Sequence, residues 1–221
     1  MSHFLLHLKR PLLTLLLWGF IIRLIVLFFA YSWDVNSHIT WGKEVLERGV
    51  QGFYDRPTID HFSTIYPNYP PISIYLFSFF YAFYSLCKFI LWQINLFIPV
   101  FPSTIVTWFE TREVIAAFMK IPSILTDIGI AYLLYLFVLK YRNDTLSALY
   151  AVIFFLFNPV FWYTSALWGQ IESITIFFIL CAFYNLLYSE RKVFPVILLI
   201  CALLTKQTSI VFIPVFFIFY L

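Results

Sequence analysis

Charged residues are scarce in this chain. Asp, Glu, Lys and Arg together make up 11% of it and hydrophobic residues 62%, with a mean hydropathy of +0.90. A soluble domain carries about 25% charged residues. The composition therefore excludes a soluble globular domain. It predicts an integral, polytopic membrane protein, because several apolar runs exceed the roughly 20 residues that a spanning helix needs.

Cysteine is also rare, and its spacing forms no motif. The three cysteines, Cys87, Cys181 and Cys201, each lie within an apolar run, without a CxxC or Cys/His pattern. Such isolated cysteines are typical of buried, inert thiols. The net charge of +3 is spread over the ends of the apolar runs. It therefore indicates membrane topology rather than a nucleic-acid partner.

Internal repeats and a cleavage site are missing too. The absence of a repeat disfavours the common transporter architectures. No small-x-small site follows the apolar run that begins at Leu12, so we expect a retained helix rather than a signal peptide. The last apolar run, 208–221, stops without a polar end. We expect one transmembrane module over 1–221, truncated at its C-terminus.

Basic pairs predict the topology, because Lys and Arg are enriched on the cytoplasmic side. Lys9 and Arg10 place the N-terminus inside, so the span 11–31 leads outward and the polar segment 32–71 lies outside. Within that segment, Ser37–Arg48 is predicted as a short surface helix that ends at Gly49. The expected fold class is all-α: a polytopic transmembrane helical bundle with a long first extracytoplasmic loop that carries short interfacial helices.

The segment 72–109 stays open between two structures. It is either a tight pair of spans that turns near Lys88, or a re-entrant or interfacial helical hairpin. The rest of the chain is expected as a series of spans and breaks: 114–139 inward, 145–157 outward, a break at Asn158–Pro159, an external segment 161–172, 173–188 inward, 193–204 outward, and 208–221 after a polar break at 205–207.

The polar segment 32–71 carries the first candidate for chemistry. Asp34 lies where the first apolar run ends, beside Trp33. An ordinary helix-flanking carboxylate is one interpretation. The other is a general base at the membrane surface, which needs geometry first and a suitable pKa second. His38 and His61 in the same segment are weak evidence for a metal site, so we expect no metal and no other cofactor.

Basic residues within apolar runs are the second kind of candidate. Lys206 lies in a polar TKQ break, and irregular backbone at membrane depth survives only where it is buried or lines a cavity. Snorkelling to the interface is the alternative. Arg23 lies within the first span, at a cost of about 2.5–3.5 kcal/mol on insertion scales, and needs a partner. Asp127 is an available one, and a structural ion pair is then the alternative. Lys120 is a further candidate.

Several short motifs occur in a characteristic order. Asp34 is followed by Trp41 and by these segments: GFY at 52–54, YPP at 69–71, FMKIPSILTD at 118–127, NP at 158–159, WGQIES at 168–173 and TKQTSIVFIPVFF at 205–217. Over most of its length the chain thus resembles the lipid-phosphosugar-dependent glycosyltransferases of the GT-C superfamily. Within that superfamily the motifs resemble those of the bacterial enzymes similar to the second GPI-anchor mannosyltransferase and of the ALG-type glucosyltransferases of the endoplasmic reticulum. Asn68 and Glu172 replace aspartates that are usual in those patterns, so mannose and glucose both stay open.

The resemblance implies a role for each candidate. Asp34 would be the base that deprotonates the acceptor hydroxyl, and the donor would be a polyprenyl- or dolichyl-phosphate hexose. Its phosphate would need positive charge as the glycosidic bond breaks, from Lys206, Arg23 or Lys120. Substrate binding is expected from Gln170, Glu172, Gln207, Trp168 and Tyr69.

The resemblance also implies the partners and the compartment. The partners would be the lipid-phosphate sugar, a glycan or glycolipid acceptor and membrane lipids, without nucleic acid. The bacterial plasma membrane is the favoured location, and the endoplasmic reticulum membrane is the alternative. A transporter or flippase of a lipid-linked precursor is the rival function. It predicts polar residues at mid-bilayer, which only Arg23 and Asp127 fit.

Overall fold

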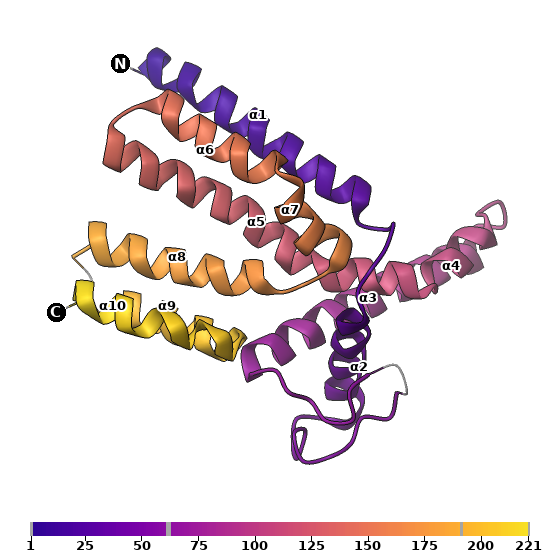
Figure 1. Cartoon of the computed structure of the whole chain (residues 1–221). Coiled ribbons are helices and arrows are strands. Elements are labelled where there is room, and N and C mark those ends of the chain that lie inside the picture. The colour runs from indigo at the N-terminus through magenta and orange to yellow at the C-terminus, as the bar shows by residue number, and fades with distance from the viewer. Residues whose placement is uncertain (1, 61–62, 191, 221) are drawn as a thin grey trace.

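Helices make up all the regular structure in the described part of the chain, residues 2–60, 63–190 and 192–220 of a computed structural model (Figure 1). In chain order they are α1 (Ser2–Val26), α2 (Trp33–Arg48), α3 (Pro71–Phe97), α4 (Ser103–Phe109), α5 (Arg112–Arg142), α6 (Thr145–Phe157), α7 (Pro159–Trp162), the π-helix η1 (Tyr163–Trp168), α8 (Glu172–Tyr188), α9 (Val193–Thr205), the 3₁₀-helix η2 (Gln207–Phe212) and α10 (Ile213–Tyr220).

The main body consists of helices that lie side by side, namely α1, α5, α6, α8, α9 and α10 (Figure 1). α5 lies between α6 and α8 and packs against both. One apolar core, which includes Leu12, Ile130 and Leu156, joins α1, α5 and α6. A second core, with Leu199 and Phe216, joins α8, α9 and α10. The two ends of the chain lie at the end of the main body away from α2, as do the turns after α5 and α8 (Figure 1).

Two helices in the described residues, α3 and α5, are long and apolar enough to cross a membrane. A third span results if α6 and the segment Pro159–Trp168, which are bent by 46° at their junction, count as one. The expected helical class is therefore confirmed, and the length and apolar composition of these helices support the expected association with membranes. The full number of spans and the orientation in a membrane stay predictions.

Local signals placed several helix ends correctly. α6 covers the predicted range because Asp144 caps its start, accepting hydrogen bonds from the amides of Leu146 (3.1 Å) and Ser147 (2.9 Å). It ends at Asn158, whose side chain accepts from Val160 N at 3.0 Å and so begins α7. α2 ends at Gly49, which has the left-handed φ of 71° that favours glycine.

The first helix departs from its predicted range. It ends at Val26 rather than at residue 31, although the chain stays apolar. The buried side chain of Lys120 on α5 donates to the carbonyl of Leu27 at 2.8 Å and to that of Ala30. A basic side chain at the C-terminal end of a helix satisfies carbonyls that have no helical partner. This tertiary contact explains the early end.

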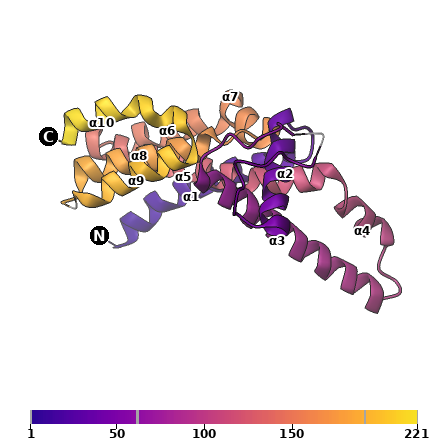
Figure 2. The ribbon, with the colours of Figure 1, turned by 90° about the horizontal axis from the view of Figure 1, so that it is seen from below.

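The segment 72–109 does not turn near Lys88. α3 runs through that residue without a break, so the pair of spans was a wrong alternative. The Lys88 side chain is about half exposed and forms an ion pair with Glu110 at 2.9 Å. α3 and α4 instead project from the main body as a hairpin (Figure 2). The shape of the segment 72–109 is therefore that of the predicted helical hairpin. Whether this hairpin is re-entrant or lies at the membrane surface stays a prediction.

α2 packs across the start of α3, and this contact holds the polar segment in place. Val35, Ile39 and Trp41 are buried there against Phe77. The closest approach is at Gly42, where an added Cβ would lie 2.6 Å from the carbonyl oxygen of Phe77. Only a residue without a side chain fits against that backbone.

Replacing Gly42 by alanine should therefore lower the free energy of unfolding by about 1–3 kcal/mol through overpacking. Alanine favours the helix by about 1 kcal/mol, but the clash is with backbone and cannot relax by a side-chain rotation. Denaturant titration of the purified protein in micelles measures the loss. Lys43→Ala, on the exposed face of the same helix, is the control, and equal stability of the two variants would contradict the close contact.

Candidate functional site

Asp34 lies in the first turn of α2 with an exposed side chain. Its carboxylate accepts a hydrogen bond of 2.6 Å from Nε2, the side-chain amide nitrogen of Gln170. Gln170 is positioned in turn by its backbone: its N–H donates to Thr164 at 3.0 Å, and its carbonyl accepts from Ser123 Oγ at 2.8 Å. A carboxylate that is open to solvent and oriented by one amide is suited to accept a proton.

Lys206 lies at the turn between α9 and η2, where the chain reverses direction toward α10 (Figure 1). Its backbone is extended, and Ser209 N–H closes the turn on its carbonyl at 3.1 Å. The ammonium donates to Glu172 Oε1 at the start of α8. The other oxygen, Glu172 Oε2, is enclosed and has no hydrogen-bond partner in the described residues. The predicted polar break at 205–207 therefore holds a lysine, Lys206, whose charge is paired with the carboxylate of Glu172.

Tyr69 connects these two groups. The Lys206 ammonium lies 5.5 Å from the centre of its ring. Burial raises the pKa of the Tyr69 phenol; the carboxylates of Asp34 and Glu172 add to the rise and Lys206 opposes it. The phenol thus lies within electrostatic range of all three charges. We call Asp34, Tyr69, Gln170, Glu172 and Lys206 the Asp34 cluster.

The other two predicted substrate ligands lie beside this cluster. Gln207 follows Lys206 and is exposed. Trp168 is 42% exposed and stacks on Tyr163, with 5.9 Å between the ring centres. Its carbonyl accepts from Ser32 N–H at 2.9 Å, which joins the end of η1 to the residue before α2. Their roles in binding stay predictions.

Arg23 is fully buried, and its predicted partner is confirmed. Its Nε lies 2.7 Å from Asp127 Oδ2, and its Nη1 donates to the carbonyls of Gly19 (2.9 Å) and Leu156 (3.1 Å). Asp127 also accepts from the hydroxyls of Ser165 and Ser173, each at 2.5 Å. This geometry is that of a structural ion pair, the alternative to phosphate binding. A phosphate role for Arg23 stays a prediction; its Nη2 is buried and has no hydrogen-bond partner among the described residues.

Lys120 is buried as well. Its ammonium is held by the two carbonyls at the end of α1, and its stem lies against Gly169, whose φ is 81°. The residue lies beside the backbone that carries Gln170, yet it does not point a free charge at the Asp34 cluster. A phosphate role for Lys120 also stays a prediction.

His38 is fully buried within a group of aromatic rings. It stacks on Phe77, with 4.1 Å between ring centres, and lies 5.6 Å from Tyr69 and 6.1 Å from Trp41. Burial, with a smaller effect of the Lys206 ammonium, lowers the pKa of His38 to about 3. The imidazole is therefore neutral in the folded protein at physiological pH.

This burial predicts a pH-dependent stability. Between pH 6.5 and about 3 the unfolded His38 binds a proton and the folded one does not, so stability is lost as the pH falls through that range. At about pH 5 the expected loss is about 2 kcal/mol relative to neutral pH. Chemical unfolding at the two pH values measures it, and His38→Phe should remove this part of the dependence. An unchanged dependence in that variant would contradict a buried neutral imidazole.

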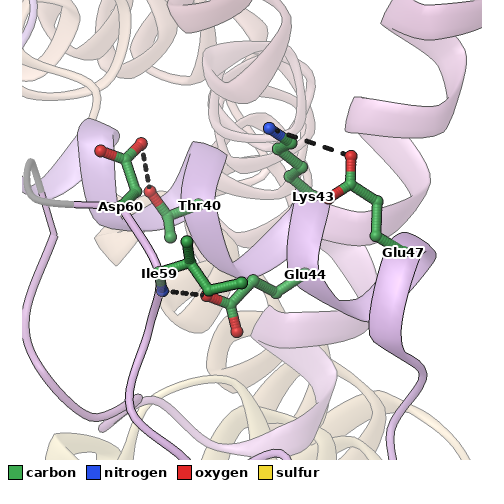
Figure 3. A pocket seen from close by; sticks show the side chains of 6 residues that line it. All are labelled: Thr40, Lys43, Glu44, Glu47, Ile59 and Asp60. Atoms are coloured by element: carbon green, nitrogen blue, oxygen red, sulfur yellow. Dashed lines mark hydrogen bonds and ion pairs between the residues drawn. The ribbon is translucent and has the colours of Figure 1, made fainter.

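A second polar region lies on another side of α2. Thr40, Lys43, Glu44, Glu47, Ile59 and Asp60 line a pocket of about 190 Å³ (Figure 3). Glu44 accepts from the amide of Ile59 at 2.7 Å, and Thr40 donates to Asp60 at 3.0 Å, so the pocket joins the loop after α2 to the helix (Figure 3). No group of three metal-ligating side chains occurs among the described residues. His61, the second histidine considered for a metal, lies outside them.

Sequence reasoning missed two supporting residues. The Ser73 hydroxyl at the start of α3 donates to the carbonyl of Thr205 at 2.5 Å and so holds the α9–η2 turn. Ser32 Oγ lies 3.5 Å from the Gln170 amide. Isolated serines carry no signal in a sequence, although Ser73 lies two residues after the YPP motif.

Comparisons of the chain with protein-family models, with curated proteins and with solved structures give no match. The described residues form an all-helical protein with two or three helices that could cross a membrane. It carries a cluster of carboxylates, a lysine and a tyrosine beside one end of its main body.

Proposed function

We propose that the chain is an integral membrane glycosyltransferase of the GT-C kind. It would move a hexose, mannose or glucose, from a polyprenyl- or dolichyl-phosphate sugar to a lipid-linked or surface glycan on the extracytoplasmic side. The observation that carries the proposal is the Asp34 cluster, in which the proposed base and the proposed phosphate ligand meet around Tyr69. The order of motifs from Asp34 to 205–217 supports the same class.

The proposed reaction needs one base and one cation. Asp34 accepts the proton of the acceptor hydroxyl, whose oxygen forms a bond to the anomeric carbon of the hexose. The bond from that carbon to the phosphate oxygen breaks, and the lipid phosphate leaves with the electron pair. Because a phosphate is already a good leaving group, no acid partner of the glycosidase kind is required.

Lys206 would stabilise the charge that develops on the phosphate. It lies at the polar turn between the apolar helix α9 and η2. Glu172 now holds the ammonium, so a bound phosphate would share or replace that contact. Gln170 would keep Asp34 oriented while the acceptor binds.

Turnover in proteoliposomes tests the proposal. Synthetic polyprenyl-phosphate mannose and polyprenyl-phosphate glucose, each with a labelled sugar, are supplied together with membrane glycolipids. The expected result is transfer of label from one of the two donors to a glycolipid. Movement of a labelled lipid across the bilayer without transfer would instead establish the flippase alternative and refute the transferase.

A further inference from the structure

An apolar groove of about 400 Å³ lies between α1 and α6, which pack side by side (Figure 1). Leu15 and Leu149 line it and also pack on the core that joins these helices to α5, so they form its floor. Leu146 and Tyr150 line it too and are 66% and 68% exposed, so one side of the groove is open. The groove therefore has the volume and the opening that a bound molecule requires.

The lining of this groove favours hydrocarbon over a polar ligand. Pro11, Thr14 and Ile153 complete the lining. The Thr14 hydroxyl donates to the carbonyl of Arg10 at 2.9 Å, so it is already paired. The phenol of Tyr150 is then the one remaining polar side-chain group. A sugar or a peptide backbone would lose its hydrogen bonds to water there without replacement, whereas a lipid chain has none to lose.

One end of the groove carries positive charge. α1 and α6 run in the same direction, so Pro11 and Leu146 lie at one end of the groove (Figure 1). Arg10 directly precedes Pro11, and Arg142 ends α5 just before α6 begins. Both arginine side chains are exposed.

These two charges are not cancelled locally. No ion pair of Arg10 or Arg142 occurs among the described residues. Asp144 is the one carboxylate in the turn between α5 and α6, and it caps α6 by accepting from two amides. Two guanidinium groups and one carboxylate leave this end of the groove with a net positive charge.

We infer that the groove binds one acyl chain of an anionic phospholipid of the surrounding membrane, with the phosphate headgroup at Arg10 and Arg142. Basic pockets between apolar helices are typical sites for such headgroups. An arginine stem can lie along apolar surface while its guanidinium reaches a phosphate and binds it bidentately. The site does not depend on sugar transfer, because its basic end lies at the end of the main body away from α2 (Figure 1).

Native mass spectrometry of the whole chain in detergent tests this site. The probes are phosphatidylglycerol, which is anionic, and phosphatidylcholine with the same acyl chains. One phosphatidylglycerol should bind about tenfold more tightly than phosphatidylcholine. Arg10→Gln and Arg142→Gln should each weaken phosphatidylglycerol binding about fivefold, the effect of one basic residue near a headgroup. Neither change should alter the binding of phosphatidylcholine.

Two further variants separate the groove from its charges. Ile153→Trp places a larger side chain in the groove at a position that is 39% exposed, so it should fold and bind both lipids more weakly. Lys192→Gln removes an exposed charge from the turn between α8 and α9, at the same end of the main body, and should bind as the wild type does.

Three results would overturn the inference. One is equal binding of the two phospholipids by the wild type. Another is binding by the arginine variants, or by Ile153→Trp, that matches that of Lys192→Gln. The third is tighter binding of a polyprenyl phosphate than of phosphatidylglycerol, lost in Ile153→Trp, because the groove would then hold a lipid carrier rather than a phospholipid.

Discussion

Replacing Asp34 by asparagine should reduce hexose transfer in proteoliposomes by about 10²–10⁴-fold, the usual contribution of a general base. Asparagine keeps an oxygen in place to accept the 2.6 Å hydrogen bond from Gln170, so the local structure should survive. What it cannot do is accept the proton of the acceptor hydroxyl. The loss should therefore appear in the rate of transfer, while binding of the lipid-phosphate donor stays near that of the wild type.

Asp55→Asn is the matched control, because Asp55 is an exposed carboxylate in the same polar segment. Its transfer rate should equal that of the wild type. Expression and thermal stability are measured for both variants. An Asp34→Asn protein that transfers sugar as fast as the Asp55 variant would remove Asp34 from the role of base.

The second large effect is expected at the buried ion pair of Arg23 and Asp127. Asp127→Asn removes the negative charge from a site where Arg23 is fully buried, and this should lower the free energy of unfolding by about 3–5 kcal/mol. Most of that loss comes from the buried guanidinium that no longer has a counter-charge. Chemical unfolding in micelles measures the change.

Two further variants make this result specific. Glu47→Gln breaks an ion pair with Lys43 whose two side chains are about half exposed, and it should change stability by about 0.5 kcal/mol or less. Arg23→Met combined with Asp127→Asn should recover much of the loss, because no unpaired charge then remains. If Asp127→Asn is no more harmful than Glu47→Gln, the pair does not hold the helices together.

Local chemistry made much of the helical pattern predictable from the sequence. The cap at Asp144 begins a helix, and the Asn158–Pro159 break and the turn at Gly49 each end one; all three act through groups only a few residues away. The pairing of Arg23 with Asp127 was predictable for a related reason. A charge in an apolar span needs a partner, and few are available.

What could not be predicted depends on contacts between distant segments. The sequence predicted a turn near Lys88 as one alternative. In the structure Lys88 lies within α3 and forms an ion pair with Glu110, which follows α4. The sequence predicted Lys120 as a cation for a phosphate, whereas in the structure its ammonium is bound by the carbonyls of Leu27 and Ala30 just after α1. In both cases the charge of one residue is satisfied by a part of the chain that no local pattern identifies.

The same distinction applies to the site. Asp34 was predicted from its place at the end of the first apolar run, Lys206 from the polar TKQ break, and Gln170 and Glu172 from the resemblance. The structure pairs Asp34 with Gln170 and Lys206 with Glu172, and the charges of Asp34, Glu172 and Lys206 all act on Tyr69. His38 was considered only as a weak metal ligand. Its burial among the rings of Tyr69, Phe77 and Trp41 follows from the packing of α2 on α3, and this packing is a tertiary property.

Lys120, which binds the carbonyls just after α1, also fixes the position of Asp34 relative to α5. Lys120 binds the carbonyls of Leu27 and Ala30, and Asp34 follows only a few residues later. Any sliding of α1 along its own axis would break these bonds before it moved Asp34. The position of the carboxylate is therefore fixed relative to α5, a helix long and apolar enough to cross a membrane, rather than relative to the axis of α1.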